Sequence, residues 1–184
     1  FDYFNQYNGT ITGGASYNSE GKLGGGFDFD GINDCVSIPD WPILNSNGAI
    51  STWINPFKAF NSASPATYFA VKINGPYLGY NILGSGTLEL LLANSSDGLQ
   101  TFEYQVDFDA GEWYHLTGTW NSTDSKLYID GSLVATNSSI DLTTPKVDAS
   151  GGHIGCGFGN SRWFNGTIDD VMIFNRSLSA VEVA

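Results

Sequence analysis

Two adjacent aspartates, Asp169 and Asp170, are the residues of this sequence that most need a chemical explanation. The run from Ile168 to Phe174 is rich in β-branched and apolar residues and predicts a strand. From Val171 onward both alternating faces are apolar, which is typical of a strand covered on both sides. Two like charges at the entrance of a buried strand are costly unless a cation or hydrogen-bond donors meet them. The pair therefore predicts either a cation site or a set of donors.

The sequence gives little support for a catalytic site built from paired carboxylates, histidine or zinc ligands. Glycoside hydrolysis needs two carboxylates that flank the scissile bond. Glu89 and Glu103 fall on candidate neighbouring strands, but each stands alone among apolar residues. His115 is interpreted as a strand histidine with a structural role, and the two histidines and two distant cysteines have no zinc-site spacing. The sequence therefore predicts a protein that is not an enzyme.

The cysteines, Cys35 and Cys156, form an even pair 121 positions apart, and each lies in a strand-like stretch. In a secreted protein such a pair favours a disulfide, whereas in a cytosolic protein it favours two buried thiols. Six Asn-x-Ser/Thr sequons point toward an extracellular glycoprotein, although an Asn-, Ser- and Thr-rich chain also produces sequons by chance. They are Asn8, Asn94, Asn121, Asn137, Asn165 and Asn175, of which the last two flank the buried strand and are the least certain.

Length and charge narrow the class of protein. A chain of 184 residues is ordinary for one domain. The net charge of −12, with seven Lys and Arg residues together, argues against a nucleic-acid or anionic-membrane partner. No apolar run approaches the ~20 residues that span a bilayer, so we expect no membrane insertion. The chain lacks an initiator Met and a signal-like start, which predicts a processed product or a fragment.

The elements that must position these residues are short strands. About a dozen are separated by turn signals, with Asp130-Gly131 as a strong hairpin signal, and residues 16–25 are interpreted as a loop. The sequence contains no long amphipathic helix; Ser177 or Ser179 would cap a single closing turn. This pattern predicts an all-β antiparallel β-sandwich that forms one domain over residues 1–184.

Five stretches carry a family resemblance. They are "LGGGFDFDGINDCVSIP" (23–39), "ISTWINP" (50–56), "EWYHLTGTW" (112–120), "KLYIDGSLVAT" (126–136) and "FNGTIDDVMIFNRSLSAVEV" (164–183). In this order they resemble laminin-G-like, concanavalin-type jelly-roll domains over nearly the whole chain. The resemblance implies a concanavalin-like jelly roll. It implies function only weakly, because the fold hosts lectins, glycosidases, lyases and adhesion modules.

The resemblance also implies a structural calcium ion. Relatives join the aspartate that enters the last strand to backbone near the N-terminus, and calcium prefers six to eight oxygen ligands. The matching ligands here are Asp169, with Asp170 beside it, then Asp2 and Asn5 in a turn that resembles the N-terminal turn of the family, and Asp30. The alternative is that these carboxylates accept backbone N–H groups in turns.

Aromatic residues beside polar ones indicate sugar binding when they are exposed. The loop candidates are Trp41, Tyr77, Arg162 and Trp163. The alternative for each is a packed aromatic or rim residue without a ligand. The sequence thus predicts an extracellular or cell-surface, non-catalytic recognition or adhesion module that binds glycan or protein. A structural subunit of a surface assembly or filament is the alternative.

The filament alternative follows from the start of the chain. Domains of the resembled family open with an apolar strand ahead of the N-terminal turn, whereas this chain begins at that turn with Phe1-Asp2. We therefore expect the family's first strand to be absent. A segment of a neighbouring subunit would then fill the vacant place by strand addition and link subunits head to tail. The plainer explanation is a fragment in which residues 1–8 cover the gap.

Overall fold

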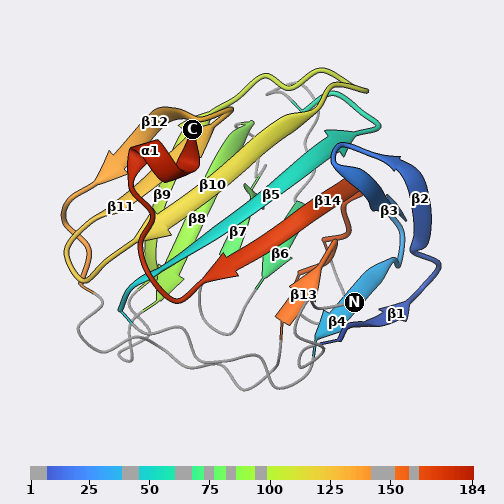
Figure 1. Cartoon of the computed structure of the whole chain (residues 1–184), viewed down its shortest axis with the longest axis horizontal. Coiled ribbons are helices and arrows are strands. Elements are labelled where there is room, and N and C mark those ends of the chain that lie inside the picture. Colours follow the sequence, from blue (N-terminus) through green and yellow to red (C-terminus); the bar gives the residue numbers. More distant parts are fainter. Residues whose placement is uncertain are drawn as a thin grey trace.

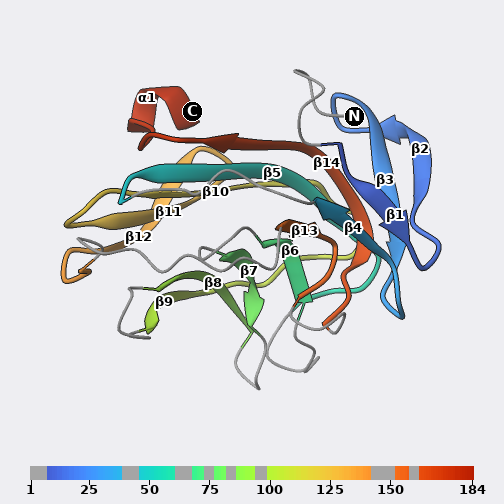
Figure 2. The same cartoon turned by 90° about the horizontal axis from the view of Figure 1, so that it is seen from below.

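The computed structural model describes residues 8–38, 46–60, 68–72, 77–81, 86–93, 99–141, 152–157 and 162–184. In these residues fourteen strands form two seven-stranded sheets that stack face to face (Figures 1 and 2). All the recorded strand pairs are antiparallel, from β1 with β4 to β8 with β9. The predicted all-β antiparallel sandwich is therefore confirmed.

Each sheet brings strands from the early and the late parts of the chain side by side. The first sheet runs β1 (Thr10–Thr12), β4 (Cys35–Ile38), β13 (Gly152–Ile154), β6 (Tyr68–Lys72), β7 (Tyr77–Asn81), β8 (Thr87–Ala93) and β9 (Leu99–Gln105). The second runs β12 (Ser132–Asn137), β11 (Ser125–Ile129), β10 (Tyr114–Trp120), β5 (Gly48–Pro56), β14 (Asn165–Phe174), β3 (Gly24–Asp30) and β2 (Ser16–Gly21). The closing strand, β14, thus lies inside the second sheet between β5 and β3, as predicted. The predicted cover on both faces from Val171 to Phe174 is wrong, because these residues are at most half-buried and Met172 is 39% exposed.

The core lies between the sheets because alternate residues of strands such as β8 and β5 point inward. Leu88, Leu90 and Leu92 of β8 are fully buried from the first sheet, and Ile50 and Ile54 of β5 are fully buried from the second. Burial of such a side chain contributes about 1.5–3 kcal/mol relative to exposure. The apolar residues that alternate in the sequence of these strands are therefore the ones that form the core.

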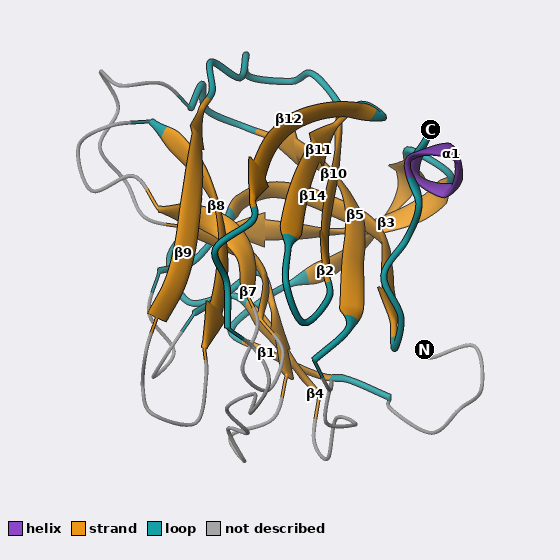
Figure 3. Cartoon of the chain, turned by 90° about the vertical axis from the view of Figure 1, so that its left-hand side faces the viewer, coloured by secondary structure: helices purple, strands orange, loops and turns teal. Residues whose placement is uncertain are grey.

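A second, smaller apolar cluster covers part of the outer face of the second sheet. Leu178 and Val183, from the C-terminal segment that contains α1 (Ala180–Val183), pack on Ala49 of β5 and Tyr128 of β11. Figure 3 shows α1 on the side of this sheet that faces away from β8 and β9. The predicted closing turn is confirmed, with Ser179 as its N-cap residue.

Residues 16–25, predicted as a loop, instead form β2 and the turn into β3. The prediction was wrong because β2 is an edge strand whose residues are exposed or half-buried, so its sequence carries no alternation of apolar and polar residues. No helix in the described parts of the chain is long and apolar enough to cross a membrane. The expected loss of the family's first strand concerns residues 1–7, outside the described ranges, and stays a prediction.

Candidate functional site

Asp169 is held by backbone N–H groups. It lies in β14 with 7% of its surface exposed. The backbone N–H of Leu23, in the β2–β3 turn, donates to its Oδ2 at 2.8 Å, and the N–H of Asp170 donates to its Oδ1 at 2.7 Å. A side chain at Gly21 would lie 2.7 Å from Asp169 Oδ2, so the turn approaches the carboxylate closely because Gly21 has no Cβ. Asp169 therefore ties the β2–β3 turn to β14.

Asp170 forms a bulge directly after this contact. The register of β14 with β5 shifts between Asp169 and Met172, and Asp170 has a left-handed backbone with φ of 49°. Asp tolerates this conformation better than most residues. The bulge lets Asp169 and Met172 both face outward, opposite Trp53 and Ser51 of β5 respectively.

The predicted calcium ligands do not form one group in the part of the chain that the structure describes. Asp30 Oδ1 accepts the N–H groups of Ile32 (2.7 Å) and Asn33 (3.4 Å) in its own turn. Asp30, Asp169 and Asp170 are not among the side chains whose ligand atoms converge. Asp2 and Asn5 lie outside the described residues, so the complete ligand set stays a prediction.

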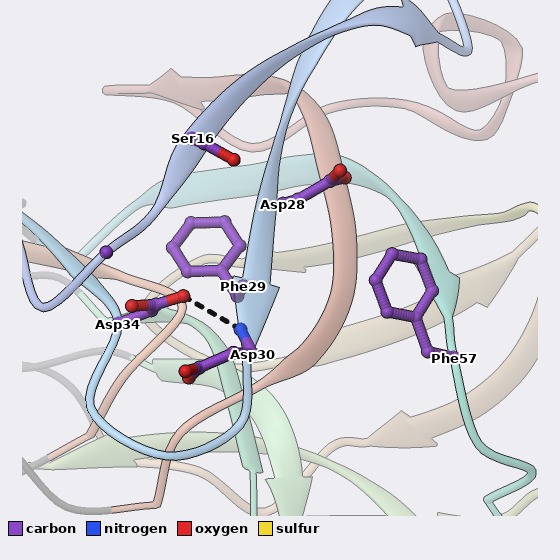
Figure 4. Close-up of a pocket in the computed structure, with 7 residues that line it drawn as sticks. Ser16, Asp28, Phe29, Asp30, Asp34 and Phe57 are labelled. Carbon is purple, nitrogen blue, oxygen red and sulfur yellow. Dashed lines mark hydrogen bonds between the residues drawn. The ribbon is translucent and has the colours of Figure 1, made fainter.

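Three aspartates surround a pocket of about 210 Å³ at the end of β3. Asp28, Asp30 and Asp34 line it together with Ser16 and Phe57, as Figure 4 shows. Asp34 Oδ2 accepts the N–H of Asp30 at 2.8 Å, whereas its Oδ1 is buried without a hydrogen-bond partner. A buried carboxylate oxygen that lacks a partner is costly, so Asp34 is the one of these three aspartates whose position the described hydrogen bonds do not fully explain.

Of the three aspartates, Asp28 has hydrogen-bond donors for both of its carboxylate oxygens. Thr167 Oγ1 donates to its Oδ1 at 2.6 Å, and the Asn18 amide donates to both carboxylate oxygens at 3.1 Å. These donors come from the two strands that flank β3, so Asp28 connects β14, β3 and β2. Its role is explained without an ion.

A polar and aromatic stack crosses the outer face of the second sheet. Trp53 and His115 are cross-strand neighbours whose rings stack with centroids 4.8 Å apart, and Lys22 Nζ lies 4.7 Å from the Trp53 ring centroid. Lys22 reaches Trp53 because the neighbouring Leu23 anchors the turn to Asp169. The stack is therefore a packed structural feature of this face.

The surroundings of His115 favour its neutral form. Burial lowers its pKa below the usual value of 6.5, and this effect exceeds the opposing influence of Asp130 and Asp170. Its Nε2 lies 2.7 Å from Ser51 Oγ, which also accepts the Thr117 hydroxyl at 3.3 Å. Ser51 can then donate to Nε2, an arrangement that fits a neutral imidazole.

The predicted ligand-binding residues are spread over the molecule. Trp41 lies outside the described residues, and of Tyr77 only the backbone, at the start of β7, is described. Arg162 and Trp163 lie together before β14: Arg162 is exposed with φ of 62°, and Trp163 is partly buried with an indole Nε1 that has no hydrogen-bond partner. An indole N–H normally finds a partner when it is buried.

Glu89 and Glu103, which the sequence placed on candidate neighbouring strands, are directly paired in the structure. They are directly opposite each other in the β8–β9 register, with Glu89 buried and Glu103 exposed, and Thr87 Oγ1 donates to Glu103 at 3.3 Å. Like charges in this position destabilise a sheet unless other groups compensate. The register between β8 and β9 could not be predicted from the sequence of either strand alone.

The disulfide between Cys35 and Cys156 is present, with Cα atoms 5.3 Å apart, so the disulfide alternative of the sequence is confirmed. Among the sequons, Asn8 and Asn175 are exposed. The Asn165 amide instead donates to the Asp30 carbonyl at 2.5 Å, and the Asn121 amide donates to Asp124 at 2.9 Å. Asn94 lies outside the described residues, and Asn137 is half-buried.

Comparison with known proteins identifies the family. The family model for the concanavalin A-like lectin/glucanases superfamily (laminin G type) matches residues 30–184, so the chain belongs to this superfamily. No curated protein matches the chain significantly. The resemblance stated from the sequence is thereby confirmed.

Solved structures share the fold. The binding domain of Paraclostridial Mosquitocidal Protein 1 superimposes with a TM-score of 0.76 at 19% identity, over 97% of this chain and 46% of that one. Domain 4 of AbnA, a GH43 extracellular arabinanase from Geobacillus stearothermophilus, in complex with arabinotriose, superimposes with a TM-score of 0.74 at 18% identity. The match covers 98% of this chain and 89% of that one. The receptor binding domain of botulinum neurotoxin C/D mosaic serotype superimposes with a TM-score of 0.73 at 20% identity, over 97% of this chain and 46% of that one. This chain thus spans about half of the two toxin domains and most of the arabinanase domain.

Proposed function

We propose that this domain is a non-catalytic recognition module that binds an oligosaccharide through the segment that contains Arg162 and Trp163. The observation that carries the proposal is the partly exposed Trp163 residue next to the exposed Arg162 residue. Sugars offer hydroxyl groups that hydrogen-bond to polar side chains, and apolar C–H faces that pack on an aromatic ring.

The comparisons support this choice of ligand class without establishing it. One similar structure, the arabinanase domain, is described in complex with a sugar, and this chain covers 89% of it. Because the identity is 18%, the likeness concerns the fold, and the sugar contacts must come from residues of this chain.

A glycan array followed by calorimetry tests the proposal, with arabinotriose included as one defined probe. Trp163→Phe replaces the bicyclic indole by a smaller phenyl ring, so we expect about tenfold weaker binding from the reduced ring contact with the sugar. Tyr17→Ala, at an aromatic residue of β2 that is 67% exposed, is the matched control and should leave affinity unchanged. An array without any bound glycan, or equal affinities for the wild type and Trp163→Phe, would contradict the proposal.

We further propose an extracellular setting with glycans on exposed sequons. The disulfide supports an oxidising compartment, since such bonds are rare in reducing ones. The exposed side chains of Asn8 and Asn175 are open to modification. Intact-mass measurement of the secreted protein before and after glycosidase treatment tests this setting.

Calcium binding is proposed at Asp30 and Asp34 instead of at Asp169. The carboxylates of Asp30 and Asp34, which line one pocket, support a cation there, whereas both oxygens of Asp169 already accept N–H groups. Calcium that binds only the folded state would stabilise it by about 2.7 kcal/mol at a hundredfold excess over Kd. A melting temperature that chelation leaves unchanged would contradict calcium binding.

The alternative function, a subunit of a surface filament linked by strand addition, has one supporting observation. β1 is an edge strand of three exposed residues that pairs with β4 in the described parts of the chain. Such an edge can template a strand from another subunit. Sedimentation of dilute protein tests it: concentration-dependent polymers would favour the filament, and a stable monomer would exclude it.

A further inference from the structure

The disulfide lies next to a histidine. Cys35 begins β4, Cys156 follows β13, and His153 Nδ1 lies 3.6 Å from Cys35 Sγ. The possible ligand atoms of the three side chains all lie within 4.8 Å of one another. In the described part of the chain, no other group of three metal-binding side chains is this compact. Both cysteines are fully buried and His153 is half-buried.

The sheet itself builds this cluster. In the β4–β13 register His153 is opposite Ser37, so Cys35, two residues earlier on the same strand, is its diagonal neighbour on the same face. Gly155 then adopts φ of 78°, and its carbonyl accepts the Phe164 N–H at 2.7 Å, which turns the chain so that Cys156 returns to Cys35. The positions of the ligand atoms therefore follow from the backbone and do not depend on the S–S bond alone.

We propose that, once a thiol reductant has opened the disulfide, Cys35, Cys156 and His153 bind one zinc ion. Two reductant thiols supply two electrons and two protons to the S–S bond, and they become a disulfide themselves. Zinc then displaces a proton from each cysteine thiol and takes the lone pair of His153 Nδ1. Thiolate and imidazole ligands together favour zinc over hard cations such as calcium and magnesium.

The geometry fits this ion. Zinc–sulfur bonds of about 2.3 Å and zinc–nitrogen bonds of about 2.0 Å at a tetrahedral angle separate sulfur from nitrogen by about 3.5 Å. The separation between Cys35 Sγ and His153 Nδ1 is 3.6 Å before any metal binds. The two sulfurs must move apart to about 3.8 Å, which rotation of a released thiol side chain provides.

Water completes the coordination. Ser37 is half-buried and its Oγ lies 3.4 Å from His153 Nδ1, so this side of the cluster is not sealed from solvent. Three protein ligands with a water in the fourth position are a common zinc arrangement. The same three residues would thus join β4 to the segment after β13 in both redox states, by a covalent bond or by a metal.

Cobalt and zinc titrations of the full chain test the proposal. We expect the reduced wild type to bind one equivalent of cobalt with thiolate charge-transfer and tetrahedral absorption bands, and zinc to displace it. The oxidised wild type should bind neither ion. His153→Ala keeps both cysteines and should weaken zinc binding of the reduced protein by at least about tenfold.

Folding is followed by circular dichroism in parallel, with the Cys35→Ser/Cys156→Ser double variant as a chain that has no thiols. If reduction unfolds the wild type, one equivalent of zinc should restore the spectrum in the wild type and fail to do so in the double variant. Equal zinc affinity of the reduced wild type and reduced His153→Ala, or a reduced wild type that neither binds zinc nor refolds with it, would overturn the proposal.

Discussion

Replacement of Asp169 by Asn distinguishes the two explanations of the buried aspartate, a bound cation and a set of hydrogen-bond donors. The wild-type carboxylate accepts two N–H groups at 2.7 and 2.8 Å and is 7% exposed, so both bonds are charge-assisted and shielded. Bonds to charged groups contribute about 1.5–3 kcal/mol each, and Asn keeps one acceptor oxygen. We expect Asp169→Asn to lower the free energy of unfolding by about 2 kcal/mol, and Asp169→Ala by about 3 kcal/mol.

Urea unfolding with and without a chelator measures this difference. If N–H donors explain Asp169, the loss in Asp169→Asn is the same in both buffers. If a calcium ion explains it, the loss disappears in chelator, since the ion is then missing from both proteins. Asp170→Asn is the matched control, because the same chemical change occurs one residue away and Asn tolerates the left-handed backbone found there. Equal losses in Asp169→Asn and Asp170→Asn would refute the reasoning.

Three further predictions concern other groups. Because burial lowers the pKa of His115 in the fold, the unfolded chain binds the proton more readily, so stability should fall as pH drops through about 6.5; urea titrations should show a shallower fall in His115→Gln. Glu103→Gln should raise the free energy of unfolding by about 0.5 kcal/mol in the same assay, since it removes one of two opposed charges. Glycopeptide mapping of secreted protein should find glycan on Asn175 and none on Asn165, whose amide donates to Asp30.

The sequence predicted the parts of the fold that local chemistry decides. Asp130-Gly131 gives the expected hairpin, with φ of 49° and 75°, because these residue types tolerate the left-handed backbone of a tight turn. The closing strand was readable from its β-branched and apolar residues, although these are not covered on both faces. The edge strand β2 was not readable, because a strand exposed on both faces has no pattern for burial to impose.

The parts that depend on register were beyond prediction. His153 is adjacent in space to Cys35 across 118 residues, and Glu89 is opposite Glu103 only in one alignment of β8 with β9. A slip of one residue would send each side chain to the other face of its sheet. For the same reason the sequence marked Asp169 as needing a partner but could not say that Leu23 supplies it.

The connection from β13 to β14 links the proposed binding residues to the rest of the fold at both ends. At its start, Cys156 is bonded to Cys35 of β4, and Gly155 accepts the N–H of Phe164. At its end, Phe164 is fully buried against Phe29 and Phe60 before β14 begins. Both described ends of this connection are thus fixed in the fold, and a fixed Trp163 would lower the entropic cost of binding at the proposed sugar site.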